Sequence, residues 1–81
     1  MTRLPRDLSG EALARALERF GYTRTRQTGS HLRLTTEEGG EHHVTVPLHD
    51  RLRVGTLAGI IAEVANHFGT SRDETVERLF G

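Results

Sequence analysis

The amino-acid sequence predicts an α+β fold in which a helix, a three-stranded antiparallel sheet and two further helices follow one another. Three observations support this prediction. Apolar residues recur at helical spacing before residue 21 and after residue 56, β-prone residues dominate the region between, and glycine-containing turns divide that region into three runs. A chain of 81 residues has room for one hydrophobic core, so we expect a single domain over residues 1–81.

The first helix is predicted from Gly10 to Phe20. Ser9 precedes it as an N-cap and Gly21 ends it. The apolar residues at positions i, i+3, i+4 and i+7 are Leu13, Ala16, Leu17 and Phe20. Charged residues occupy the other face and include the i, i+4 pair Glu11 and Arg15. One side of this helix should therefore be buried and the other solvated.

Three short strands are predicted next, at residues 22–27, 30–36 and 41–46, with turns at Thr28-Gly29 and at residues 37–40. Side chains alternate between the two faces along a strand. The face predicted to be buried carries Leu32, Leu34, His42, Val44 and Val46, with His42 partly buried and paired. The opposite face carries His31, Arg33, Thr35, His43 and Thr45. The first strand shows no clear inner face.

Residues 47–55 are interpreted as a loop in which Leu52 and Val54 are apolar anchors and His49 makes an ordering hydrogen bond. A helix begins near Thr56 and carries a full apolar stripe: Leu57, Ile60, Ile61, Val64 and Phe68. Ser71 and Glu74 form a capping box for a short last helix. The helices can cover only one face of the sheet, so the polar face should stay open.

The composition excludes several classes of function. The chain has no Cys, which removes disulfides, thiolate nucleophiles and cysteine zinc sites. A small core leaves no room for a deep cofactor cavity, so no cofactor is expected. Five His are present without a His-Glu-x-x-His motif or a carboxylate cluster, so no metal site is expected. We find no signal peptide and no apolar run near the ~20 residues of a membrane span, and we expect a cytoplasmic protein.

The charges are distributed unevenly although they sum to zero. All 11 fixed cations are Arg, whose planar guanidinium can bind phosphate through two hydrogen bonds. Residues 22–36 carry +3 from Arg24, Arg26 and Arg33, and residues 37–43 carry −3 from Glu37, Glu38 and Glu41. Arg24, Arg26 and, in the loop, Arg51 are candidates for phosphate contacts.

Several motifs resemble the HicA family of toxins from type II toxin–antitoxin systems. These are Thr28-Gly29-Ser30-His31, the run at residues 43–49 (His-Val-Thr-Val-Pro-Leu-His), Val54-Gly55-Thr56-Leu57 and the opening residues 4–10. The likeness spans about residues 4–65. It implies a fold like that of a double-stranded-RNA-binding domain and a small endoribonuclease that cleaves mRNA. It also implies His31 as the catalytic residue and a HicB-type antitoxin as the partner that neutralises the toxin.

His31 also has a chemical case of its own. RNA can be cut without a metal because its 2′-OH lies beside the scissile phosphate, and an imidazole can take or give that proton near neutral pH. Gly29 permits a positive φ and Ser30 can donate to a phosphate oxygen. Arg33 shares the strand face of His31 and can stabilise charge on phosphorus. His43 is either a second acid or base or a residue that simply lies on the exposed face.

Two other readings of the sequence stay open. A fold of this kind can bind RNA by shape without doing chemistry, in which case His31 is a solvated residue. The exposed sheet face or a strand edge can alternatively recruit a protein partner. In each case we expect the free protein to be monomeric.

Overall fold

The computed structural model describes residues 3–81 and has the predicted order α-β-β-β-α-α. Its elements are α1 (Gly10–Phe20), β1 (Thr23–Thr28), β2 (His31–Thr36), β3 (His42–Pro47), α2 (Val54–Phe68) and α3 (Arg72–Phe80). The strands form one antiparallel sheet in the order β1-β2-β3. The predicted α+β class is confirmed, whereas the specific likeness to a double-stranded-RNA-binding domain stays a prediction.

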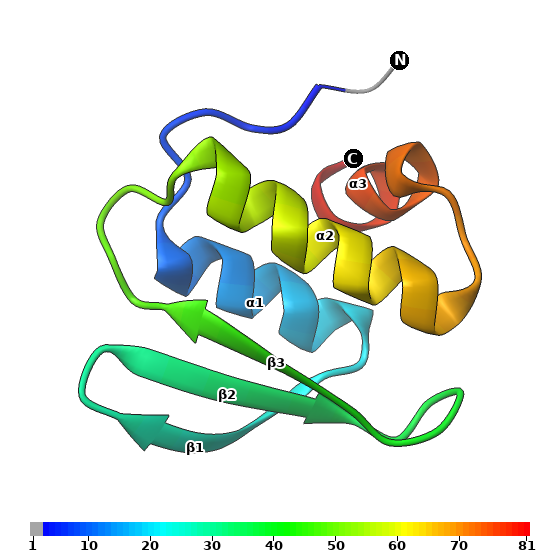
Figure 1. The fold of residues 1–81 in the computed structure, drawn as a ribbon, viewed down its shortest axis with the longest axis horizontal. Coiled ribbons are helices and arrows are strands. Elements are labelled where there is room, and N and C mark those ends of the chain that lie inside the picture. Colours follow the sequence, from blue (N-terminus) through cyan, green and yellow to red (C-terminus); the bar gives the residue numbers. More distant parts are fainter. Residues whose placement is uncertain (1–2) are drawn as a thin grey trace.

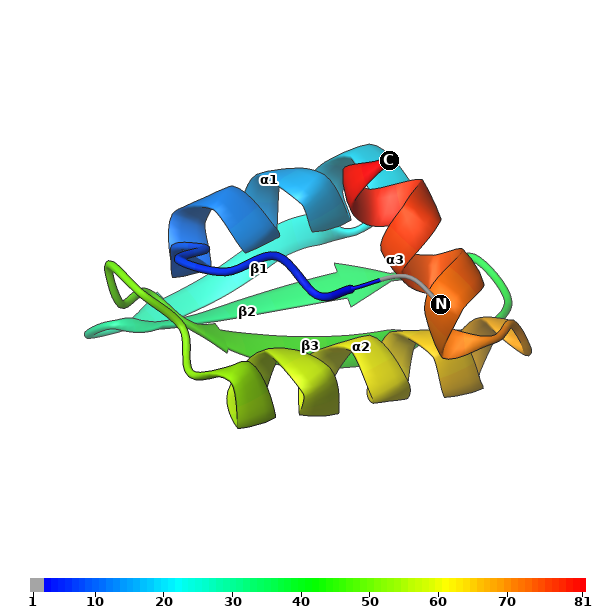
Figure 2. The same ribbon diagram turned by 90° about the horizontal axis from the view of Figure 1, so that it is seen from above.

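The helices gather on one side of the sheet. Figure 1 shows α1 and α2 above the three strands, and Figure 2 shows these two helices running side by side along the sheet with α3 across one end. α3 packs against α1 and α2. The lower face of the sheet in Figure 1 is covered by no helix within residues 3–81. The expectation that one face stays open is therefore confirmed.

The core follows from the strand register. Leu32 of β2 lies opposite Val46 of β3, and Leu34 lies opposite Val44. All four side chains are at most 2% exposed. The helices bury against them the apolar residues predicted to face inward, among which the least exposed are Leu13, Leu17, Leu57, Ile61 and Val64. Alternation along β2 and β3 then directs the intervening polar side chains to the open face.

Both predicted side-chain caps are present. The Ser9 hydroxyl accepts a hydrogen bond from the Ala12 N–H at 3.0 Å, and the Ser71 hydroxyl accepts one from the Glu74 N–H at 3.0 Å. Each bond satisfies one of the amide donors that a helix leaves free in its first turn. The starts of α1 and α3 are thus fixed by local chemistry.

The start of α2 differs from the prediction. The helix begins at Val54, two residues before Thr56, and Val54 is 61% exposed. The prediction that Val54 is a core anchor is therefore wrong. The prediction for Leu52 is confirmed, because this residue is 6% exposed and anchors the loop. The N-cap, Arg53, makes no side-chain capping bond, so no local signal in the sequence marks this helix start.

The loop after β3 is tied to the start of α1 through backbone hydrogen bonds. The Gly10 N–H donates to the His49 carbonyl at 2.9 Å, and the Leu52 N–H donates to the Leu8 carbonyl at 2.8 Å. His49 thus orders the loop as expected, but through its backbone. A Cβ atom on Gly10 would collide with the carbonyl oxygen of Pro47. The absence of a side chain at Gly10 is what lets α1 approach the end of β3 this closely.

Replacing Gly10 should therefore destabilise the fold. We expect Gly10→Ala to lower the free energy of unfolding by about 1–3 kcal/mol, because the backbone of Pro47 must move to admit the methyl group. Gly59→Ala is the matched control, since a Cβ there meets no atom within 4 Å and the residue lies inside α2. This control should gain roughly 0.5–1 kcal/mol from helix propensity. Urea unfolding of both variants measures the difference, and equal stabilities would contradict this packing.

Candidate active site

The open face of the sheet is formed by rows of side chains from three strands. One row contains Thr28, His31 and Pro47, the next contains Arg26, Arg33 and Thr45, and the third contains Thr23, Thr35 and His43. We call the side chains of these nine residues the outer face. Directly paired residues of antiparallel strands point to the same side, so each row projects away from the helices. The face predicted for the second and third strands is confirmed.

His31 stands at the first position of β2, directly after a tight turn. Thr28 pairs with His31, so the turn consists of Gly29 and Ser30, one residue later than predicted. Gly29 has a φ of 59°, whereas the φ of Ser30 is not positive. A positive φ at the first loop position alone is the signature of a type II′ turn, which explains the glycine. The His31 side chain is exposed to solvent at this end of the outer face.

The turn that carries His31 is fixed from the other side by the loop after β3. The Ser30 carbonyl accepts a hydrogen bond from the Leu48 N–H at 2.6 Å. His31 itself pairs with Pro47 across the sheet. The backbone around His31 is therefore held by both neighbouring strands, while its ring stays open to a ligand.

Arg26 and Arg33 face each other across β1 and β2 in the row beside His31. Both side chains are exposed. None of the ion pairs found among residues 3–81 includes either guanidinium. Two like charges directly opposite each other on a sheet are unfavourable unless an anion joins them. This row is the part of the outer face best suited to bind a phosphate.

An irregularity in β1 explains why Arg26 points outward. The pairing shifts between Arg24, which lies opposite Leu34, and Arg26, which lies opposite Arg33. Thr25 is the extra residue of a β-bulge, so Arg24 and Arg26 lie on opposite faces although they are two residues apart. This is the reason that the sequence of the first strand shows no clear inner face.

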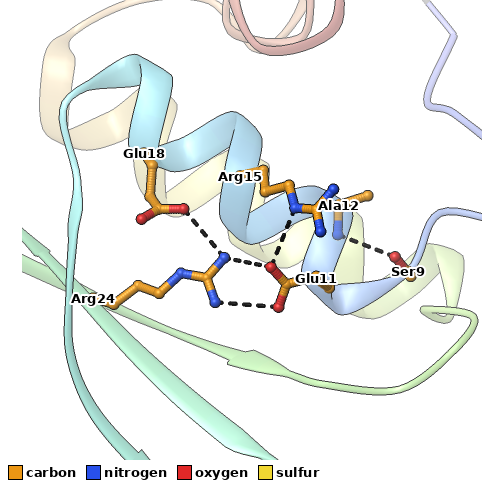
Figure 3. Close-up of polar contacts among 6 residues, drawn as sticks. All are labelled: Ser9, Glu11, Ala12, Arg15, Glu18 and Arg24. Atoms are coloured by element: carbon orange, nitrogen blue, oxygen red, sulfur yellow. Dashed lines mark hydrogen bonds and ion pairs between the residues drawn. The ribbon is translucent and has the colours of Figure 1, made fainter.

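Arg24 lies on the helix-covered side and is already paired (Figure 3). Its guanidinium donates two hydrogen bonds to the Glu11 carboxylate, one of them 3.1 Å long, and lies 3.1 Å from an oxygen of Glu18. The bonds to Glu11 and Glu18 raise the pKa of Arg24, and the bond from Arg24 lowers the pKa of Glu11. Arg24 therefore attaches β1 to α1 and lies apart from His31. We do not propose it as a phosphate contact.

His43 is held by hydrogen bonds at both ring nitrogens. Nε2 lies 2.8 Å from a carboxylate oxygen of Glu41, and Nδ1 lies 2.7 Å from the Thr35 hydroxyl. The Thr35 hydroxyl is 3.0 Å from that of Thr25, which also donates to the Arg33 carbonyl at 3.3 Å. These hydrogen bonds link Glu41, His43, Thr35 and Thr25 in that order, so the series ends at the bulge. Glu41 and Thr25 were not predicted from the sequence. Thr25 reaches Thr35 only through the bulged register, whereas Glu41 lies two residues before His43 and could have been found from the alternation of side chains.

The positions of the remaining candidates limit their roles. His43 pairs with Thr35, which lies four residues after His31 along β2, a distance of about 13 Å. The rings of His31 and His43 therefore cannot act on one phosphodiester bond. Arg51 pairs with Asp7 at 3.0 Å, and both side chains are largely exposed. A competing anion can separate such a surface pair at little cost. Arg51 thus remains a possible phosphate contact at the loop.

His42 and His67 form a separate cluster on the helix-covered side of the sheet. His42 lies 2.8 Å from the Tyr22 hydroxyl and stacks on His67 with ring centroids 4.4 Å apart. His67 Nε2 donates to the Glu38 carbonyl at 2.8 Å. Burial raises the pKa of Tyr22 to about 12, with a smaller contribution from Glu63. Burial and the neighbouring His67 lower the pKa of His42. The predicted half-buried, paired state of His42 is confirmed.

Two further classes of site find no candidate in the part of the chain that the structure describes. Residues 3–81 contain no group of three or more His, Asp or Glu side chains arranged to hold a metal ion. They also contain no helix with the length and apolar character needed to cross a bilayer.

Comparison with known proteins identifies a family for this chain. Residues 10–65, well over half of the chain, match the model of a family described as HicA toxin of bacterial toxin–antitoxin systems. The matched segment runs from the start of α1 through most of α2 and includes the whole sheet. No curated protein and no solved structure matches the chain.

The His42 environment predicts a pH dependence of stability. Because the folded-state pKa of His42 lies below its usual value of 6.5, the unfolded chain binds the proton first as the pH falls. The stability that neutral His42 confers is complete above pH 6.5 and declines as the pH falls toward the folded-state pKa.

Urea unfolding between neutral and mildly acidic pH measures this effect. His42→Gln keeps an acceptor for the Tyr22 hydroxyl but does not titrate, so its unfolding midpoint should fall less over this range than that of the parent. A parent and variant with the same pH dependence would show that His42 is not the group responsible.

Proposed function

This chain belongs to the HicA family of bacterial toxins, and on that premise we propose that it is a metal-independent endoribonuclease with His31 as its catalytic residue. Family membership gives the role of toxin in a toxin–antitoxin system. The observation that best supports the enzymatic proposal is the placement of His31. Its exposed imidazole lies on the one sheet face left open by the helices, beside two arginines without an acidic partner.

We infer that RNA itself supplies the nucleophile. His31 accepts the proton of a 2′-OH while the 2′ oxygen attacks the adjacent phosphorus. The bond from phosphorus to the 5′ oxygen breaks, and the leaving oxygen takes a proton from water. The products are a 2′,3′-cyclic phosphate and a 5′-hydroxyl end. Such general acid–base assistance contributes about 10²- to 10⁴-fold to a rate, and a pKa near neutrality serves it well.

The groups around His31 suit the charge that develops in this reaction. Arg33 follows two residues after His31 on the same face, so its positive charge lies near the phosphate that is cut and favours the negative charge that develops there. The Gly29-Ser30 turn brings backbone and a hydroxyl to the same end of the face. The backbone there is held in place before substrate binds, which lowers the cost of orienting the reacting groups.

The same exposure suggests how the toxin is neutralised. We propose that a HicB-type antitoxin covers His31 and the neighbouring arginines and thereby excludes mRNA. The rows around His31 carry positive and polar groups and no acidic side chain, so an acidic surface on the antitoxin would complement them. The substrate mRNA places this activity in the cytoplasm.

Removing the imidazole tests the proposal. We expect His31→Ala to remain folded and to cleave RNA at least about 100-fold more slowly, with toxicity on induced expression lost as well. His67→Gln is the matched control, because this histidine lies on α2 at the opposite end of the sheet and should leave cleavage unchanged. Cleavage of labelled RNA is measured with and without a chelator, and circular dichroism confirms the fold of both variants.

Three outcomes of that experiment would contradict the mechanism. They are cleavage by His31→Ala at the parent rate, loss of parent cleavage in the chelator, and cleavage of a substrate that carries 2′-deoxyribose at the cut position. RNA binding by the parent without cleavage over long incubation would instead favour a non-catalytic RNA-binding module.

A further inference from the structure

We propose that Arg26 and Arg33 together form a subsite that holds a single phosphate of the RNA strand, the one adjacent to the phosphate that is cut. This inference rests on the proposed ribonuclease function and adds to it a substrate contact made by a pair of residues on two strands. Three features of the structure support it: the spacing of the rows, the absence of acidic partners and the bulge at Thr25.

The spacing of the rows places the pair one step from His31. Arg33 follows His31 by two residues along β2, which separates their rows by about 7 Å. Arg26 lies directly opposite Arg33 on β1, with Cβ atoms of such pairs about 4.5–5.5 Å apart. Two guanidinium groups at this separation can bind the oxygens of one phosphate between them. A strand with its scissile phosphate at His31 would therefore bring the neighbouring phosphate to this pair.

Neither guanidinium group of the pair is neutralised by a carboxylate of residues 3–81, and the two residues lie opposite each other on the outer face. Arg15, Arg24, Arg51 and Arg78 all form ion pairs with carboxylates. None of the ion pairs among residues 3–81 includes Arg26 or Arg33, although they repel each other. A bound phosphate would remove this repulsion, and it could bind both guanidinium groups without displacing a carboxylate.

The bulge at Thr25 is the device that creates the pair. In a regular strand Arg26 would share a face with Arg24 and would point toward the helices. The extra residue instead places Arg26 opposite Arg33. The Thr25 hydroxyl bonds to the Arg33 carbonyl and to the Thr35 hydroxyl, which His43 and Glu41 hold in turn. These hydrogen bonds hold the bulge against the backbone of Arg33.

The salt dependence of RNA binding tests the subsite separately from catalysis. The probe is a labelled single-stranded RNA of about 12 nucleotides. Every ribose carries 2′-fluoro in place of the 2′-OH, so the probe cannot be cut. Fluorescence anisotropy gives the Kd at salt concentrations from about 50 to about 200 mM, and each phosphate contact contributes about 0.7 to the slope of log K against log salt.

The expected result is a loss of one contact. Arg26→Gln and Arg33→Gln should each lower the magnitude of the slope by about 0.7, and the double variant should lower it by no more than either one, because both guanidinium groups are needed to hold the one phosphate. Arg15→Gln is the control of equal charge change, since Arg15 is 69% exposed on α1 and away from the sheet face. Its slope should equal that of the parent.

Several results would overturn the subsite. They are an unchanged slope for Arg26→Gln, a twofold larger loss in the double variant than in either single variant, and an absence of RNA binding by the parent at low salt. Failure of the proposed function looks different. If the parent does not cleave ordinary RNA but Arg26→Gln still reduces the slope, the subsite stands and the catalytic proposal falls. If His31→Ala stops cleavage but the arginine variants bind RNA like the parent, the catalytic proposal stands and the subsite falls.

Discussion

Everything on the outer face depends on the burial of Leu32 and Leu34 against the helices. These side chains are at most 2% exposed, and the pleat then leaves His31 and Arg33 no direction but outward. A shift of register by one residue would bury the imidazole and expose the leucines, so the free energy of the core also specifies the site. The helices cover only one face, and the uncovered face is where we propose that RNA reaches His31.

The outer face also depends on the different positions of two neighbouring arginines. Arg24 holds β1 to α1 through Glu11 and Glu18, while Arg26 faces solvent beside Arg33. The bulge at Thr25 makes this division possible within three residues. The formal charge of zero thus describes the molecule poorly, because several cations are neutralised within the fold and the cations near His31 are not.

The sequence predicts regular features well and irregular ones poorly. Alternation along β2 and β3 indicates both faces correctly because each of these strands keeps a strict period of two. β1 has an extra residue, so its period gives no answer until the pairing partners are known. α2 lacks a side-chain cap and its start was misplaced by two residues. His31 could be proposed from its motif, whereas the position of Arg26 in the row beside it depends on the bulge and is a property of the fold.

We propose that the outer face is the surface that binds RNA. Titration of ¹⁵N-labelled protein with an uncleavable single-stranded RNA, followed by NMR, tests it most directly. We expect the largest amide shifts on the Gly29-Ser30 turn, on β2 and on the part of β1 after the bulge, with little change in α1 and α3. Shifts concentrated on the helices, with the outer face unaffected, would contradict it.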